Sequence, residues 1–200
     1  MDKRVQVLSA TGVQDAFLKL GLPFRFSDLE LEKFQTVPNG LPDASILCFP
    51  TPESNSGLNL LNLRKLLGVD PGHPPSFFDH PWYLEEAFGH TNCLSGWHVI
   101  ETAVRPESQE TSFDSFKSAV AGDLMIPTAV EVVLMLFLYY AVFGEQLLTR
   151  KHTWCADEAS LGRFVTVGAF GRNGVFISSH PPSYSSRGLG LCRSFKLPRT

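Results

Sequence analysis

The sequence contains few cysteines, and they lie far apart. Only four occur among 200 residues, whereas small disulfide-stabilised domains carry them much more densely. We therefore expect free, buried thiols in a reducing compartment, with a single disulfide in the strand-rich C-terminal part as the alternative. The four cysteines are Cys48, Cys93, Cys155 and Cys192, and the alternative pairs Cys155 with Cys192.

The N-terminal segment lacks the pattern of a secretory signal peptide. Residues 1–20 read MDKRVQVLSATGVQDAFLKL, and Gln14, Asp15 and Lys19 interrupt the apolar stretch that export would need. The sequence therefore predicts a cytoplasmic location.

Long runs of one charge are also missing. The 17 basic and 20 acidic residues are scattered and give a formal net charge of -3, so there is no basic stripe for a phosphate backbone. Hydrophobic residues at 44% and charged residues at 18% are ordinary values for a folded chain. We expect one domain, with or without an appended segment, and no nucleic-acid partner.

No apolar run is long enough to cross a bilayer, which takes about 20 residues. The strongest one, VVLMLFLYYAVF, covers residues 132–143 and is closed by Glu131 and Glu145. Thr128 stands three residues before Glu131, as in a capping box, and Gly144 is a typical left-handed helix end. The pattern predicts a helix over residues 128–143 that is buried on most sides.

Catalytic signatures are absent as well. There is no G-x-S-x-G, no P-loop and no G-x-G-x-x-G between a strand and a helix; Gly168, Gly171 and Gly174 recur every third residue within a predicted hairpin. Glu85 and Glu86 are neighbours on a predicted helix and point to different sides, so they do not form a carboxylate pair. These absences favour a protein that is not an enzyme, and we expect no cofactor.

Histidines are concentrated in the middle of the chain. His90 and Cys93 have a spacing that two metal ligands could use, but a closed zinc site needs four converging ligands. We expect surface or loop histidines, and a metal-dependent enzyme is the alternative. The residues concerned are His73, His80, His90, His98 and Cys93.

The remaining patterns predict an α+β fold, with helices first and a compact antiparallel sheet last. In the sheet, RFVTVGAF alternates Val165 and Val167 on one face with Phe164 and Thr166 on the other, and GVFISS follows after the connection GRNG. The predicted helices cover residues 12–20, 58–67, 82–88 and 112–124. The predicted strands cover residues 44–49, 96–104, the hairpin 163–179, and 190–195, and the first of them is ended by Pro50 and Pro52. Residues 69–81 are predicted to be a proline-rich loop. Ser54, Asn55 and Ser56 are the cap candidates of the helix that stops at Gly68, and Trp82 and Trp97 are expected in the core.

The chain contains, in this order, GWHVIETAVRPES, two predicted helices, WCAD, GRFVTVGAFGRNGVFIS and LGLCRSF. This order resembles that of proteins with the C-type-lectin-like fold. Within that fold the similarity is to the formylglycine-generating enzymes and the variable ligand-binding proteins diversified by retroelements. It covers residues 81–197. The resemblance implies a C-type-lectin-like domain over residues 81–200, preceded by an N-terminal segment, residues 1–80, that is an adaptor, an oligomerisation segment or part of the core.

The enzymes of this branch bind copper through two closely spaced cysteines near the end of the fold. Cys155 and Cys192 are widely separated here, so the resemblance implies the variable ligand-binding function rather than the oxidase. In that function the C-terminal strands and loops are a fixed scaffold that presents exposed side chains to a ligand.

The segment SSHPPSYSSR, residues 178–187, has the composition of a binding loop. A tyrosine among serines offers a large contact area at low entropic cost, and paired prolines reduce the cost of ordering on association. The alternative is an ordinary exposed loop. We expect a protein or other macromolecular ligand to contact a surface formed by Trp154, Asp157, Phe164, Ser178, His180, Tyr184, Ser185 and Arg187.

Overall fold

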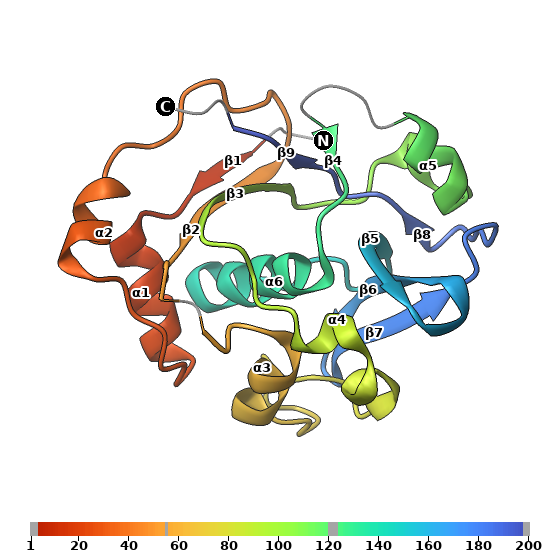
Figure 1. Cartoon of the computed structure of the whole chain (residues 1–200), viewed down its shortest axis with the longest axis horizontal. Helices are drawn as coiled ribbons and strands as arrows, with labels where there is room; N and C mark the ends of the chain where they lie inside the picture. The colour runs from red at the N-terminus through yellow and green to blue at the C-terminus, as the bar shows by residue number, and fades with distance from the viewer. Residues whose placement is uncertain (1–3, 55, 120–123, 198–200) are drawn as a thin grey trace.

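The computed structural model describes residues 4–54, 56–119 and 124–197, which fold into an α+β arrangement of two mixed sheets around one central helix (Figure 1). None of the described helices is long and apolar enough to cross a membrane. In sheet order, the first sheet contains β1 (Val5–Val7), β2 (Ile46–Thr51), β3 (Gly96–Glu101), β9 (Ser194–Phe195) and β4 (Leu124–Met125). The second contains β7 (Gly174–His180), β6 (Arg163–Gly171), β5 (His152–Ala159) and β8 (Leu189–Gly190).

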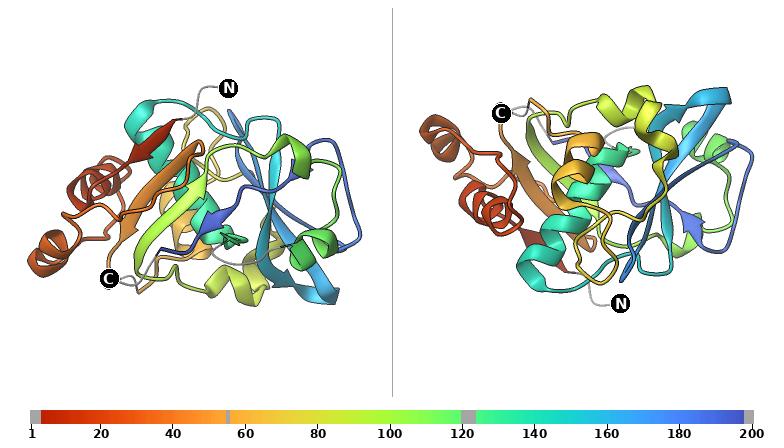
Figure 2. Two further views of the ribbon diagram at one scale, coloured as in Figure 1. Left: turned by 90° about the horizontal axis from the view of Figure 1, so that it is seen from above. Right: turned by 90° about the horizontal axis from the view of Figure 1, so that it is seen from below.

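The central helix is α6 (Ala129–Phe143), and it confirms the prediction made from its apolar run. Thr128 and Glu131 form the capping box, and Gly144 ends the helix with φ 73° in the left-handed region. The helix lies between the two sheets (Figure 2), and it contacts α1, β3, β5 and β6. Because it is covered on several sides, 11 of its 15 residues are buried, as its uniform apolarity requires.

The first sheet joins the beginning, middle and end of the chain. β1 runs parallel to β2, and the β2–β3, β3–β9 and β9–β4 pairs are antiparallel. One face packs on α6, and the other carries a smaller cluster that includes Cys48, Val99 and Trp97.

Strand β2 extends to Thr51, so the prediction that it ends before Pro50 is wrong. Leu8 N–H donates to the carbonyl of Cys48, so the backbone groups of Cys48 and, two residues on, of Pro50 point toward β1. β1 pairs only as far as Cys48. The N–H that proline lacks is therefore not needed by any ladder.

The second sheet contains the predicted hairpin, β6 and β7, joined through Arg172 and Asn173. A register shift lies between Gly168 and Gly171, where Ala169 has φ 44°. Phe170 consequently joins the core beside Val165 and Val167, instead of lying with Phe164 on the other face as the alternation predicts.

The third strand of this sheet is β5, which the sequence analysis did not assign. The predicted strand 190–195 is wrong as a single element. Its residues divide between β8, which pairs with β5, and β9, which pairs with β3 and β4 in the other sheet.

The helices follow the predictions in part. α1 (Ala10–Lys19) and α3 (Leu60–Leu67) agree with them, but the N-cap of α3 is Asn59, not one of the three predicted cap residues. α2 (Asp28–Lys33), with the capping box of Ser27 and Glu30, was not predicted. Residues 82–88 form the 3-10 turn η1 (Pro81–Glu85) and the short α4 (Ala87–His90). The predicted helix 112–124 contains α5 (Phe113–Ala119), and its residues 120–123 lie outside the described part of the chain. Two further 3-10 turns are η2 (Pro106–Ser108) and η3 (Ser160–Gly162).

All four cysteines are buried and free. The alternative disulfide between Cys155 and Cys192 is not formed. Burial raises the pKa of Cys48 to about 12, and it raises the pKa of Cys155 and Cys192 as well. These thiols therefore stay protonated and behave as small apolar core residues.

Candidate functional site

The predicted binding loop follows β7 and is held against the segment from η2 to α5. Asp114 N–H donates to the carbonyl of Pro182 at 3.3 Å, and Glu110 N–H donates to the carbonyl of Ser186 at 3.2 Å. The ammonium group of Lys151 donates to the carbonyl of Arg187 at 2.8 Å. These contacts fix the loop at its start and at its end.

Four of the predicted residues form the accessible part of this surface. The rings of His180 and Tyr184 are stacked, with centroids 4.4 Å apart and planes 13° from parallel, and Tyr184 is 41% exposed. Ser185 is exposed, and the Arg187 side chain reaches solvent and forms an ion pair with Glu110 at 2.9 Å. Burial, followed by the charge of Arg163, lowers the pKa of His180, so the stacked ring is neutral near pH 7.

Trp154 lies beneath this surface instead of within it. It is fully buried, meets the edge of His180 at 6.1 Å, and packs against Phe113. The indole Nε1 has no hydrogen-bond partner among the described residues, and neither has the hydroxyl of Thr166 on the neighbouring strand. Trp154 therefore supports the stacked pair and does not itself reach a ligand.

The remaining predicted residues, Phe164, Ser178 and Asp157, are partly buried. Phe164 stacks on Phe113 with ring centroids 3.8 Å apart, and Ser178 lies partly buried on β7. The Asp157 carboxylate accepts a hydrogen bond from Ala129 N–H at 2.6 Å, at the start of α6. Burial raises the pKa of Asp157 to about 6, although that hydrogen bond opposes the shift.

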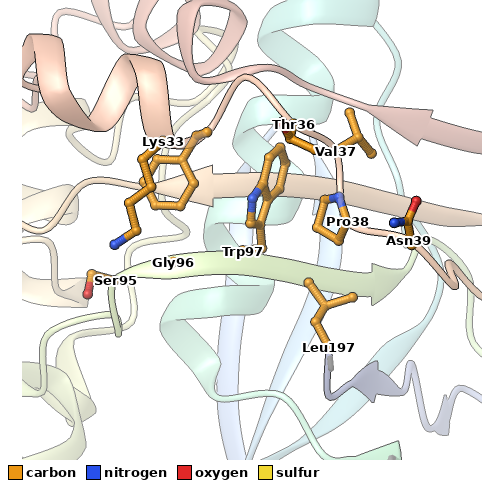
Figure 3. A pocket seen from close by; sticks show the side chains of 10 residues that line it. Lys33, Thr36, Val37, Pro38, Asn39, Ser95, Gly96, Trp97 and Leu197 are labelled. Atoms are coloured by element: carbon orange, nitrogen blue, oxygen red, sulfur yellow. The ribbon is translucent and has the colours of Figure 1, made fainter. Parts of the chain in front are cut away.

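A second concave surface, on the first sheet, was not predicted. A cleft of about 750 Å³ lies over Trp97, between the end of α2 with the loop that follows it and the last described residue, Leu197 (Figure 3). Phe34, Val37 and Pro38 contribute apolar walls, and Phe34 meets the Trp97 ring edge to face at 5.8 Å. The volume is in the range of ligand-binding clefts. The sequence signal was weak because the lining comes from short, non-periodic segments.

A smaller cleft of about 170 Å³ adjoins it and shares Ser95, Trp97 and Leu197. His98 and Glu131 line this cleft. The two clefts thus lie next to one another at the beginning of β3.

His98 is buried, so the expectation that it is a surface or loop histidine is wrong. Its Nδ1 is 2.9 Å from Glu131 Oε1, and its Nε2 is 3.0 Å from both the Leu94 carbonyl and the Thr51 hydroxyl. Carboxylate and carbonyl oxygens only accept hydrogen bonds, so both ring nitrogens donate and the ring is an imidazolium. Burial alone would lower the pKa of His98, but the hydrogen bonds with Cys93 and Glu131 outweigh it and raise the pKa to about 10.

Cys93, His98 and Glu131 have the order of a nucleophile, a base and a carboxylate. The Cys93 sulfur is 3.8 Å from His98 Nε2. However, Nε2 already donates to oxygen atoms at shorter distance, and Cys93 is 1% exposed in the main core. The second oxygen of Glu131 accepts from Thr128, so the carboxylate is also committed to the helix cap. The cluster is a buried connection between β2, β3 and α6.

Two of the other candidate histidines, His73 and His80, have separate partners. His73 pairs with Asp70 at 2.9 Å, and His80 stacks on Phe176 at 5.4 Å. Within residues 4–54, 56–119 and 124–197, no three His, Cys, Asp or Glu side chains form a group suited to a metal ion. Glu86 accepts hydrogen bonds from the backbone N–H and the hydroxyl of Ser160, at 3.0 Å each.

Comparisons of the chain with protein-family models, with curated proteins and with solved structures find no match.

Proposed function

We propose that this protein is a ligand-recognition protein and not an enzyme, with a binding surface formed by the loop 178–187 and the strands beneath it. The observation that carries the proposal is the stacked pair of His180, the last residue of β7, and Tyr184, which is exposed on the loop that follows. That loop is held at both ends. The resemblance to C-type-lectin-like variable proteins of the retroelement-diversified branch is part of the same proposal, as the family in which such a surface has this role.

The physical basis is preorganisation. Binding is weakened when side chains or loops must be ordered, at about 0.5–1.5 kcal/mol for each flexible side chain. Tyr184 is already stacked, and the loop around it is already hydrogen-bonded to Glu110, after η2, and to Asp114 of α5. A ligand would therefore meet a surface that loses little entropy on contact.

The chemistry of the surface favours a protein or another macromolecule with polar and aromatic groups. Arg187 is balanced by Glu110, and exposed ion pairs contribute at most about 1 kcal/mol. The hydroxyls of Tyr184 and Ser185 are flexible donors and acceptors, and aromatic residues commonly dominate interface energy. Phe164 and Trp154 keep this layer in place from below.

An enzyme of the formylglycine-generating type or a metal-dependent enzyme is the alternative proposal, based on the resemblance and on the histidines. It has less support, because Cys155 and Cys192 are fully buried and the histidines lie apart.

The test is a quantitative pull-down from the native host with three forms of the protein. The first is unchanged, the second carries His180→Ala, Tyr184→Ala and Arg187→Ala, and the third is a control with Leu18→Ala, Leu29→Ala and Lys65→Ala, exposed positions on α1, α2 and α3. We expect the first and third forms to retain a partner protein in equal amounts. The second form should retain at least about ten-fold less of it, because its interface anchors have been removed. Equal retention by all three folded forms contradicts the proposal.

A further inference from the structure

The backbone of β3 is open on one side at Trp97. Leu8 N–H donates a hydrogen bond to the Cys48 carbonyl, so the even-numbered residues of β2 direct their backbone groups toward β1. The odd-numbered residues of β2 therefore direct their backbone N–H and C=O groups toward β3, where they pair with Gly96, His98 and Ile100. Trp97 therefore points its N–H and C=O away from β2, like Glu101, whose N–H donates to the Arg193 carbonyl at 2.9 Å.

The ladder on this side stops before it reaches Trp97. The β3–β9 pairing consists of Ile100 with Ser194, and no described backbone group hydrogen-bonds to Trp97 on that side. An open N–H and C=O on a strand edge is a template for pairing with another extended chain.

The two clefts lie on the two faces of this open edge. Trp97 and Phe34 line the larger cleft on the outer face, whereas His98 and Glu131 line the smaller one on the face toward α6. Figure 3 shows Trp97 and Pro38 above β3 and Leu197 beside it. Successive side chains of a bound strand point to opposite faces, so they would enter the larger and the smaller cleft alternately.

Among the described residues, the surroundings are largely apolar and contain one cation without an ion-pair partner. Leu94 is 75% exposed, Met125 41% and Val37 39%, and all three lie at or beside these clefts. Lys33 is paired with Glu53, but Lys196, which lines the smaller cleft, is exposed and has no ion-pair partner among the described residues. The charge balance thus favours a ligand with a carboxylate.

The edge of β7, in contrast, is covered. Val175 exchanges backbone hydrogen bonds with Ser76 and Phe78, and the indole of Trp82 donates to the Ile177 carbonyl at 2.8 Å. The β3 edge at Trp97 lacks such hydrogen bonds among the described residues, although Leu197 lies beside it (Figure 3). A strand added there would find both unpaired backbone groups and space for side chains.

We propose that the edge of β3 at Trp97 binds an extended peptide segment of a partner protein. The segment pairs with the backbone of Trp97, places large apolar side chains in the cleft over the Trp97 ring and a smaller one in the cleft at His98, and directs an acidic residue to Lys196. This site is on the opposite sheet from the loop 178–187 and is independent of the function proposed for that loop.

The test uses a synthetic probe, the blocked peptide Glu-Leu-Val-Leu-Glu, titrated into the full chain. We expect saturable binding well below about 1 mM, and slower hydrogen exchange of the Trp97 amide in the complex. Methylating the amide nitrogens of the two leucines or that of the valine gives two further probes. One of them should bind about ten-fold more weakly and the other as before, because only alternate amides of a strand face its neighbour.

Matched variants separate the site from non-specific binding. Lys196→Glu should lower the affinity for the acidic probe about ten-fold and raise the affinity for a probe with lysine in place of the two glutamates. Leu161→Ala, an exposed change at the second sheet, should leave both affinities unchanged. The proposal is overturned if the probe does not saturate, if the Trp97 amide exchanges at the same rate with and without it, or if Lys196→Glu does not change the preference. Loss of binding on changing Tyr184 would assign the peptide to the loop surface and would also contradict the proposal.

Discussion

The His98 imidazole has a hydrogen-bond acceptor on each ring nitrogen, which fixes its charge and its orientation. Glu131 accepts on one side, and Leu94 and Thr51 lie on the other. A buried pair of this kind is strongly coupled to its surroundings, because removing one partner leaves the other charged and unpaired. The pair connects β3 to the first turn of α6 at the floor of the smaller cleft.

The raised pKa of His98 predicts a specific dependence of stability on pH. Its pKa is about 10 in the folded protein and about 6.5 in an unfolded chain. The folded state therefore holds the proton more tightly, and the stabilisation is complete below pH 6.5 and is lost as the pH rises toward 10. The free energy of unfolding should fall across this range by up to about 1.4 kcal/mol per pH unit.

Urea unfolding between pH 6 and 10, followed by circular dichroism, measures this fall. His98→Gln should be less stable than the wild type at pH 6.5 and should lose the additional slope. Asp157→Asn is the matched control, because the raised pKa of Asp157, about 6, affects stability only between about pH 4 and 6. Parallel curves for wild type and His98→Gln above pH 6.5 would show that the imidazole is not charged in the fold.

At the scale of elements, α6 is the part on which both sheets depend. It contacts β3 of the first sheet and β5 and β6 of the second. Leu136 and Phe137 are 0% and 1% exposed, and Phe137 touches Phe77 and Phe170 at ring distances of 5.3 and 5.5 Å. The buried side chains of α6 are therefore enclosed by core residues and cannot reach solvent.

Truncation at either position should be strongly destabilising. Leu136→Ala and Phe137→Ala each remove a fully buried side chain, and we expect a loss of about 2–5 kcal/mol in the free energy of unfolding. Val142→Ala, on the same helix but 42% exposed, should cost less than about 1 kcal/mol. Thermal and urea melts measure the three variants, and wild-type melting of both interior variants would contradict the burial of α6.

The same elements show what the sequence could predict. Helix α6 was predictable because its apolar circumference, Thr128, Glu131 and Gly144 all give the same answer locally. The split of residues 190–195 was not, because Leu189 pairs with His152 and Ser194 with Ile100, and these distant partners are not encoded in the segment itself. Likewise, the exposure of Tyr184 and Arg187 could be predicted from the composition of the loop. The burial of Trp154 and the cleft over Trp97 could not, because they depend on which distant segments pack against these residues.

At the scale of the whole molecule, the thiols report on the integrity of the core. The four cysteines come from β2, the loop before β3, β5 and the segment before β9, and all are at most 1% exposed. A folded molecule should therefore react with none of them on the time scale on which an exposed thiol reacts. Titration with Ellman's reagent should find four free thiols after denaturation without reductant, and close to none before it. Two or fewer after denaturation would indicate a disulfide.

The final prediction concerns residues 1–80, which the sequence left either as a separate segment or as part of the core. They supply β1 and β2, the strands next to β3, and α1, which packs on α6. Without them, β3 loses its whole pairing with β2, and the core cluster that contains the buried side chains of α6 loses Phe17 and Phe49. Lost apolar burial costs about 25 cal/mol for each Å², and a domain has only about 5–15 kcal/mol of net stability. The fragment 81–200 should consequently fail to fold alone, without a cooperative melt or dispersed amide signals in its NMR spectrum. Adding the separate fragment 1–80 should restore both, whereas a cooperative melt of 81–200 alone would show that the N-terminal segment is an appendage.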